Sequence, residues 1–102
     1  NKDYSGTIPE TWRNISAVFS ALGDEHRQRI LLSFEPNERL NVGQIAGIST
    51  LARSTVSHHL KVLREADVLI AERKGKEIYF RVNKTFLQDA FGKVSTYLDR
   101  LL

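Results

Sequence analysis

Apolar side chains recur at steps of three and four residues near both ends of the chain. This spacing places them on one face of a helix, so it predicts a first helix over residues 9–22 and a last helix over residues 85–102. Residues 1–8 carry no such pattern and are expected to form a loose arm. The main apolar positions of the two stripes are Trp12, Ile15, Phe19, Leu22, Leu87, Phe91, Val94, Leu98 and Leu101.

Shorter helices are predicted in between, each preceded by a residue that can accept hydrogen bonds from the first helical N–H groups. Asp24 is expected to cap a helix over about residues 25–35. Asn41 is expected to cap another over about residues 42–48. A longer amphipathic stretch follows at residues 54–69, and its apolar face is expected to consist of Val56, Leu60, Leu63 and Ala66.

A β-hairpin, called the wing below, is predicted over residues 68–83. Two β-prone runs flank the polar segment Lys74-Gly75-Lys76, and glycine suits the backbone of a tight turn. In the second run apolar and polar residues alternate, which predicts one buried face.

The order helix, helix, helix-turn-helix, hairpin, helix predicts a winged helix-turn-helix domain with additional terminal helices. We expect one mainly α-helical domain with a small β-hairpin over residues 1–102, with the helix-turn-helix at residues 42–66. The chain has no apolar run that could span a bilayer and no leader segment, so a cytoplasmic location is expected. Because the chain contains no methionine, we also expect natural residues before Asn1.

The amphipathic stretch begins with small hydroxyls, imidazoles and cations rather than large apolar groups. Such a helix end can enter the major groove while its apolar face stays on its own protein. Basic residues also crowd the predicted hairpin tip, where they suit phosphate contacts. Taken singly, these features also fit an ordinary surface helix and a solubilising turn, but their pairing favours DNA. The residues expected to contact DNA are Arg53, Ser54, Thr55, Ser57, His58, Lys61, Arg73, Lys74 and Lys76.

Positive charge is concentrated in the same part of the chain. The net charge is only +3, yet residues 53–84 contain eight Lys and Arg against four Asp and Glu. Residues 1–52 contain five basic and six acidic side chains. This distribution favours a polyanionic partner.

Three stretches resemble the ArsR/SmtB family of winged-helix transcriptional regulators. Residues 21–31 are similar to the family's opening segment, residues 54–69 to its recognition helix and residues 73–82 to its wing. The resemblance implies a sequence-specific DNA-binding regulator, acting as a repressor, that forms a homodimer through its terminal helices. A twofold dimer would present two recognition helices about 34 Å apart to a pseudo-palindromic operator. The expected interface residues are Trp12, Ile15, Phe19, Phe91, Val94, Tyr97, Leu98 and Leu101.

The family is also known for metal sensing, but this chain lacks the ligands of its usual sites. One site uses cysteines at the start of the third helix, and the chain has no cysteine. Another uses histidine with carboxylates along the last helix, which has no histidine here. We therefore expect no metal at these sites, no cofactor and no catalytic residue, and we expect His26 and His59 to be structural. A non-standard metal or small-molecule site, and a winged-helix protein-interaction module, remain alternatives; the effector is unknown.

The turn before the recognition helix departs from the family pattern. The family usually has glycine at the position of Thr50 and a capping serine at that of Ala52. Either the turn has another geometry, or Ser54 caps a helix that starts later. Gly47 weakens the short third helix by about 1 kcal/mol relative to alanine, so we expect a less rigid helix-turn-helix.

Overall fold

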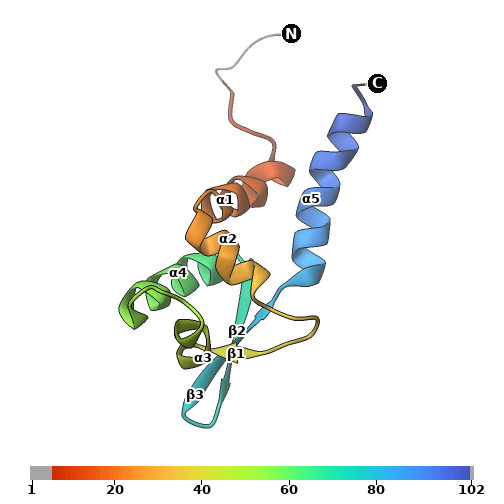
Figure 1. The fold of residues 1–102 in the computed structure, drawn as a ribbon. Helices are drawn as coiled ribbons and strands as arrows, with labels where there is room; N and C mark the ends of the chain where they lie inside the picture. The colour runs from red at the N-terminus through yellow and green to blue at the C-terminus, as the bar shows by residue number, and fades with distance from the viewer. Residues whose placement is uncertain (1–5, 102) are drawn as a thin grey trace.

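The computed structural model describes residues 6–101, which form a group of helices with a small sheet at one end (Figure 1). None of its helices is both long and apolar enough to span a bilayer. The predicted arm lies partly in residues 1–5, outside the described residues, and residues 7–9 have no regular structure. In chain order the elements are the 3-10 helix η1 (Glu10–Trp12), α1 (Arg13–Leu22), α2 (Glu25–Leu32), β1 (Leu40–Asn41), α3 (Val42–Gly47), α4 (Arg53–Glu65), β2 (Leu69–Lys74), β3 (Glu77–Val82) and α5 (Lys84–Asp99).

The two predicted helix caps are confirmed. Asp24 Oδ1 accepts hydrogen bonds from the backbone N–H groups of His26 at 2.7 Å and Arg27 at 3.3 Å. Asn41 Oδ1 accepts from the N–H of Gln44 at 2.8 Å, and Gln44 Oε1 accepts from the N–H of Asn41 at 2.8 Å. This reciprocal pair satisfies two N–H groups that α3 itself cannot. It stabilises a helix of only six residues.

The recognition helix is shorter than predicted. The stretch 54–69 was expected to be one helix, but α4 ends at Glu65 and the chain turns sharply at Asp67, whose φ is 63°. Beyond this residue the N–H of Val68 donates to the carbonyl of Leu63 at 3.0 Å. Such a bond across a left-handed residue closes a helix. α2 likewise ends earlier than predicted, at Leu32 rather than near residue 35.

The sheet has three antiparallel strands in the order β1-β3-β2, one more than predicted. β1 adds Leu40 opposite Phe80 on the edge of the hairpin. Two residues are too few to give a periodic pattern, so this strand was missed. Gly75 occupies the hairpin turn with φ 64°, as predicted. The predicted buried face is confirmed at Phe80, whereas Ile78 near the tip is exposed.

The core lies where α4 packs against α1, α2, α3 and the root of the wing. One expected dimer-interface residue, Ile15, belongs to this core: only 2% of its surface is exposed in the single chain. It therefore has almost no surface left for a second copy, and this assignment was wrong. Val94 is half-buried and packs on the core edge. The buried core residues are Ile15, Val18, Ala21, Ile30, Ile45, Val56, Leu60, Leu63, Ala66, Val68, Leu69, Phe80, Leu87 and Ala90.

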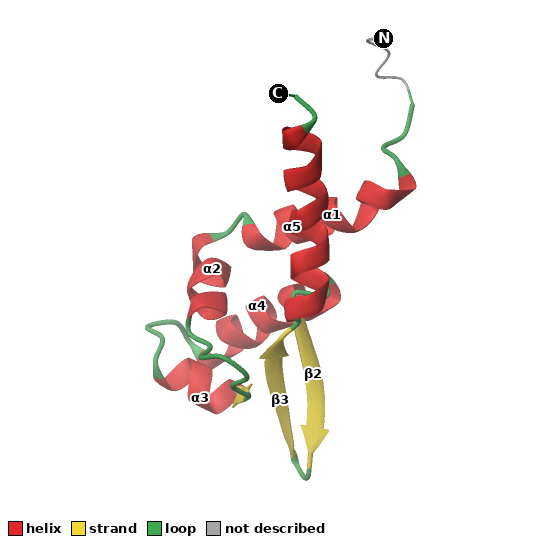
Figure 2. Cartoon of the chain, turned by 90° about the vertical axis from the view of Figure 1, so that its right-hand side faces the viewer, coloured by secondary structure: helices red, strands yellow, loops and turns green. Residues whose placement is uncertain are grey.

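An apolar surface remains along α1 and α5. From the root of the wing, α5 extends away from the hairpin tip, toward the opposite end of the molecule (Figures 1 and 2). Trp12 and Tyr97 meet edge to face with ring centroids 6.0 Å apart. The radius of gyration is 15.9 Å, larger than the roughly 13 Å of a compact 100-residue domain. The exposed apolar residues here are Phe19, Phe91, Tyr97, Leu98 and Leu101, which we call the terminal-helix face.

Candidate nucleic-acid interface

The turn between α3 and α4 decides which residue begins the recognition helix. Ser49 Oγ accepts the N–H of Leu51 at 3.0 Å, and Thr50 keeps a negative φ. Ala52 is extended, with φ −63° and ψ 149°, and provides no side-chain cap. The chain therefore enters α4 without a left-handed residue at position 50 and without a side-chain cap at position 52. The alternative in which Ser54 caps a later helix is wrong, because Ser54 already lies in the first turn of α4.

The beginning of α4 has one buried and one exposed face. Val56 and Leu60 are fully buried, and they hold the helix on the core. All nine residues predicted to contact DNA are exposed. None of them makes a salt bridge or side-chain hydrogen bond to another residue of 6–101. Their donors and acceptors are therefore available to a partner.

Arg53 lies beside α3. A Cβ atom added at Gly43 would stand 3.4 Å from Arg53 Nη1, so the guanidinium passes close to the first turn of α3. Gly43 leaves room for it. A contact from Arg53 to DNA would therefore come from the α3 side of the recognition helix.

Arg27 connects three helices and was not identified from the sequence. Its Nε donates to the carbonyl of Ala21 at 2.6 Å and its Nη2 to that of Ser20 at 3.4 Å, both in α1. Its Nη1 lies 3.2 Å from His59 Nδ1 in α4. The ring of His59 also stacks on that of His26, with centroids 5.8 Å apart. The structural role predicted for His59 is confirmed. Nothing local could signal its partner, which is 32 residues away.

His59 is held in its neutral form. Burial lowers the pKa of His59, and the positive charge of Arg27 acts in the same direction, although the Asp24 carboxylate opposes both. Because a guanidinium can only donate, Nδ1 must accept and the ring hydrogen sits on Nε2. The bond that orients α4 therefore requires an uncharged imidazole.

The basic side chains are unpaired within residues 6–101 at the tip of the wing and paired with a carboxylate at its root. Arg73, Lys74 and Lys76 are exposed around the turn. At the root, Glu72 Oε1 accepts from Arg39 Nε at 3.0 Å and from Arg81 Nε at 3.1 Å. The hydrogen bond from Arg39 is the main reason that the pKa of the Glu72 carboxyl is lowered, although burial opposes the shift. Arg81 belongs to the basic segment 53–84, but its guanidinium is paired with Glu72.

Within the described residues, no group of three or more His, Asp or Glu is close enough together to hold a metal ion. His58 and His59 have ring centroids 5.9 Å apart, but one is exposed and the other buried. The adjacent histidines therefore have different roles.

Comparison with known proteins agrees with this architecture. The profile of bacterial regulatory proteins of the arsR family matches residues 24–70. The transcriptional repressor SdpR of Bacillus subtilis (strain 168) is 32% identical over 83 residues, which cover 81% of this chain and 91% of SdpR.

Two solved structures show the same winged helix-turn-helix fold. An ArsR-like transcriptional regulator from Rhodococcus sp. RHA1 superposes with a TM-score of 0.77 at 23% identity, covering 90% of this chain and 89% of that one. A homodimeric winged helix-turn-helix DNA-binding domain, Mb0332 (fragment 1-100) from Mycobacterium bovis, superposes with a TM-score of 0.70 at 21% identity, covering 95% and 91%. The predicted fold and the predicted resemblance are confirmed: this chain belongs to the arsR family of bacterial regulatory proteins.

Proposed function

We propose that this chain is a homodimeric, sequence-specific repressor that binds a pseudo-palindromic operator in double-stranded DNA. The proposal depends most on how side chains are arranged at the beginning of α4. Its hydroxyl and imidazole groups are exposed and unpaired among residues 6–101, while the opposite face is fixed in the core. A helix held in this way can enter the major groove without rearranging.

The two kinds of exposed side chain have different tasks in this proposal. In helix-turn-helix proteins the N-terminal residues of the recognition helix contact base edges. We therefore assign base-edge or adjacent phosphate contacts to Ser54, Thr55, Ser57 and His58. The cations contact phosphates and contribute affinity for any sequence. Arg53 contacts either guanine or a phosphate. The phosphate-contacting cations are Lys61, Arg73, Lys74 and Lys76.

A second copy covers the terminal-helix face in this proposal. Leu98 and Leu101 are 54% and 64% exposed, and burying them between two copies is favourable. The homodimeric state of the Mycobacterium bovis domain supports the same arrangement. Two recognition helices would then lie about 34 Å apart and read two half-sites. The proposed interface residues are Trp12, Phe19, Phe91, Val94, Tyr97, Leu98 and Leu101.

Repression follows if a bound dimer occludes a promoter, and the Bacillus subtilis relative is itself named a repressor. Because the proposed partner is chromosomal DNA, we expect the protein to act in the cytoplasm.

A protein-interaction module is less well supported, since a protein partner does not require three cations at the wing tip that are unpaired within residues 6–101. No catalytic group enters the proposal.

The test begins with selection of fragments bound from genomic DNA, followed by fluorescence anisotropy on a selected duplex and on a scrambled duplex at several salt concentrations. Lys74→Ala with Lys76→Ala should weaken binding to both duplexes alike and lower the salt dependence, because phosphate contacts release counterions. His58→Ala should instead reduce the preference for the selected duplex.

The matched control is Arg13→Gln, which removes a positive charge from α1, where Arg13 pairs with Glu10 at 2.7 Å. It should bind both duplexes like the parent. Parent-like binding by the wing and His58 variants together would show that neither surface meets DNA and would refute the proposal.

A further inference from the structure

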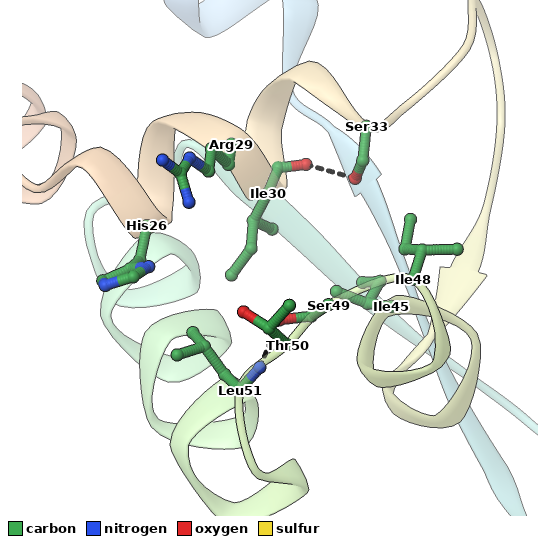
Figure 3. A pocket seen from close by; sticks show the side chains of 9 residues that line it. All are labelled: His26, Arg29, Ile30, Ser33, Ile45, Ile48, Ser49, Thr50 and Leu51. Carbon is green, nitrogen blue, oxygen red and sulfur yellow. Dashed lines mark hydrogen bonds between the residues drawn. The ribbon is translucent and has the colours of Figure 1, made fainter.

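A small cavity lies between α2 and the turn that leads into α4 (Figure 3). Its volume is about 170 Å³. Ile30, Ile45 and Leu51 provide apolar walls, and Ile48 also lines it although 69% of its surface is exposed. Covering exposed apolar surface is favourable, so a ligand with a hydrocarbon part gains free energy here.

The cavity lining carries one guanidinium, that of Arg29, beside the neutral hydroxyls of Ser33, Ser49 and Thr50. His26 adds an imidazole, and no Asp or Glu among the described residues 6–101 lines the cavity. Figure 3 shows both side chains extending from α2 on the same side of Ile30. Arg29 makes no salt bridge with another residue of 6–101. The guanidinium is therefore available to an anionic group next to an apolar wall.

We infer that this cavity binds a small organic monocarboxylate about the size of benzoate. An enclosed cavity of about 150 Å³ lined by apolar side chains accommodates benzene, so the volume here suffices for a hydrocarbon part of roughly that size. The carboxylate pairs with Arg29, because a guanidinium matches a carboxylate with two parallel hydrogen bonds. The hydrocarbon part packs on the isoleucines.

The ligand would touch the segment that sets the start of the recognition helix. Ser49 and Leu51 both line the cavity, and the hydrogen bond between them shapes the turn before α4. Occupancy should therefore change DNA affinity, and DNA should change ligand affinity by the same factor. This regulatory part rests on the proposed DNA-binding function, whereas the site itself does not.

Binding is tested on the DNA-free protein by two-dimensional amide NMR. Benzoate should shift the amide signals of residues 26–33 and 45–51 saturably, and neutral benzamide should bind about tenfold more weakly, as expected for loss of a charge-assisted bond. Arg29→Gln should abolish the preference for benzoate. Arg64→Gln, which removes an exposed cation outside the cavity, should retain it. Shifts that do not saturate at millimolar benzoate, or equal binding of the amide, would refute the site.

The regulatory part is tested by repeating the DNA titration at saturating benzoate. Operator affinity should change severalfold in the parent and not in Arg29→Gln. Unchanged affinity in the parent would refute regulation. A loss of DNA affinity in Arg29→Gln without benzoate would make Arg29 a phosphate contact and refute the inference. A chain that binds benzoate but no DNA would refute the proposed function while supporting the site.

Discussion

At the residue scale, Arg27 and His59 show how one contact can orient a helix. The guanidinium joins two α1 carbonyls to an imidazole of α4. That His59 is structural could be predicted, because it is adjacent to the buried Leu60. That Arg27 holds it could not, since the contact exists only after α2 packs on α4. Long-range polar partners leave no trace in the local sequence.

This contact predicts a pH dependence of stability. The unfolded chain takes up a proton on the His59 imidazole near pH 6.5, but the lowered pKa of His59 in the folded protein opposes protonation. The free energy of unfolding should therefore fall as the pH drops from 6.5 through the lower folded pKa. Urea denaturation between pH 7 and pH 5 measures this.

The substitution His59→Gln should make the free energy of unfolding less dependent on pH between pH 7 and pH 5. Glutamine can still accept a hydrogen bond from Arg27, but it cannot titrate. His58→Gln, at an exposed position, should keep the parent profile. An equally steep profile in His59→Gln would show that other groups cause the acid sensitivity. Asp24, whose pKa is lowered by its cap hydrogen bonds against the effect of burial, contributes only at lower pH, below about 4.

At the element scale, helices with both a cap and a periodic apolar face could be predicted, and elements defined by their neighbours could not. Asp24 and Asn41 mark helix starts by local chemistry alone. The strand β1 exists because β3 offers an edge to it. The end of α4 depends on Asp67 adopting a left-handed φ, which glycine usually does. Neither feature has a signal in the sequence.

Gly47 at the end of α3 provides a test of local stability. A Cβ added there would meet nothing within 4 Å, and alanine favours helix by about 1 kcal/mol over glycine. Gly47→Ala should thus raise the free energy of unfolding by about 0.5–1 kcal/mol. Gly75→Ala is the opposite control: its φ is 64°, so it should destabilise by about 1–2 kcal/mol. Urea denaturation of the parent and of both variants measures these differences in the free energy of unfolding. A destabilised Gly47→Ala would mean that the glycine has a conformational role.

At the scale of the whole molecule, the sequence predicted the apolar stripes but not how they divide between core and surface. Ile15 and Phe19 belong to one stripe, yet the first is buried and the second is half exposed. The division depends on where α4 and α5 pack against α1, which periodicity does not encode. The remaining exposed part of the stripes is what makes a second copy necessary in our proposal.

Charges placed on the terminal-helix face should separate the two copies. Leu98→Glu with Leu101→Glu should convert a dimer into a folded monomer, because carboxylates are costly to bury without partners. Light scattering after size exclusion gives the mass. Leu32→Glu is the control, since Leu32 is 82% exposed on α2 and should leave the mass unchanged. A dimer that persists in the double variant would place the interface elsewhere.

The double pairing of Glu72 has a consequence for selectivity. One carboxylate restrains two guanidiniums, those of Arg39 and Arg81, at the base of a positively charged hairpin. The hydrogen bonds and charges of these two arginines lower the pKa of the Glu72 carboxyl, which favours its ionised form. In the proposed DNA complex, Glu72 would thereby reduce the non-specific affinity for nucleic acid. Glu72→Gln would free the guanidiniums of Arg39 and Arg81 for phosphate contacts. The affinity for every duplex would rise, and the preference for the operator over other sequences would fall.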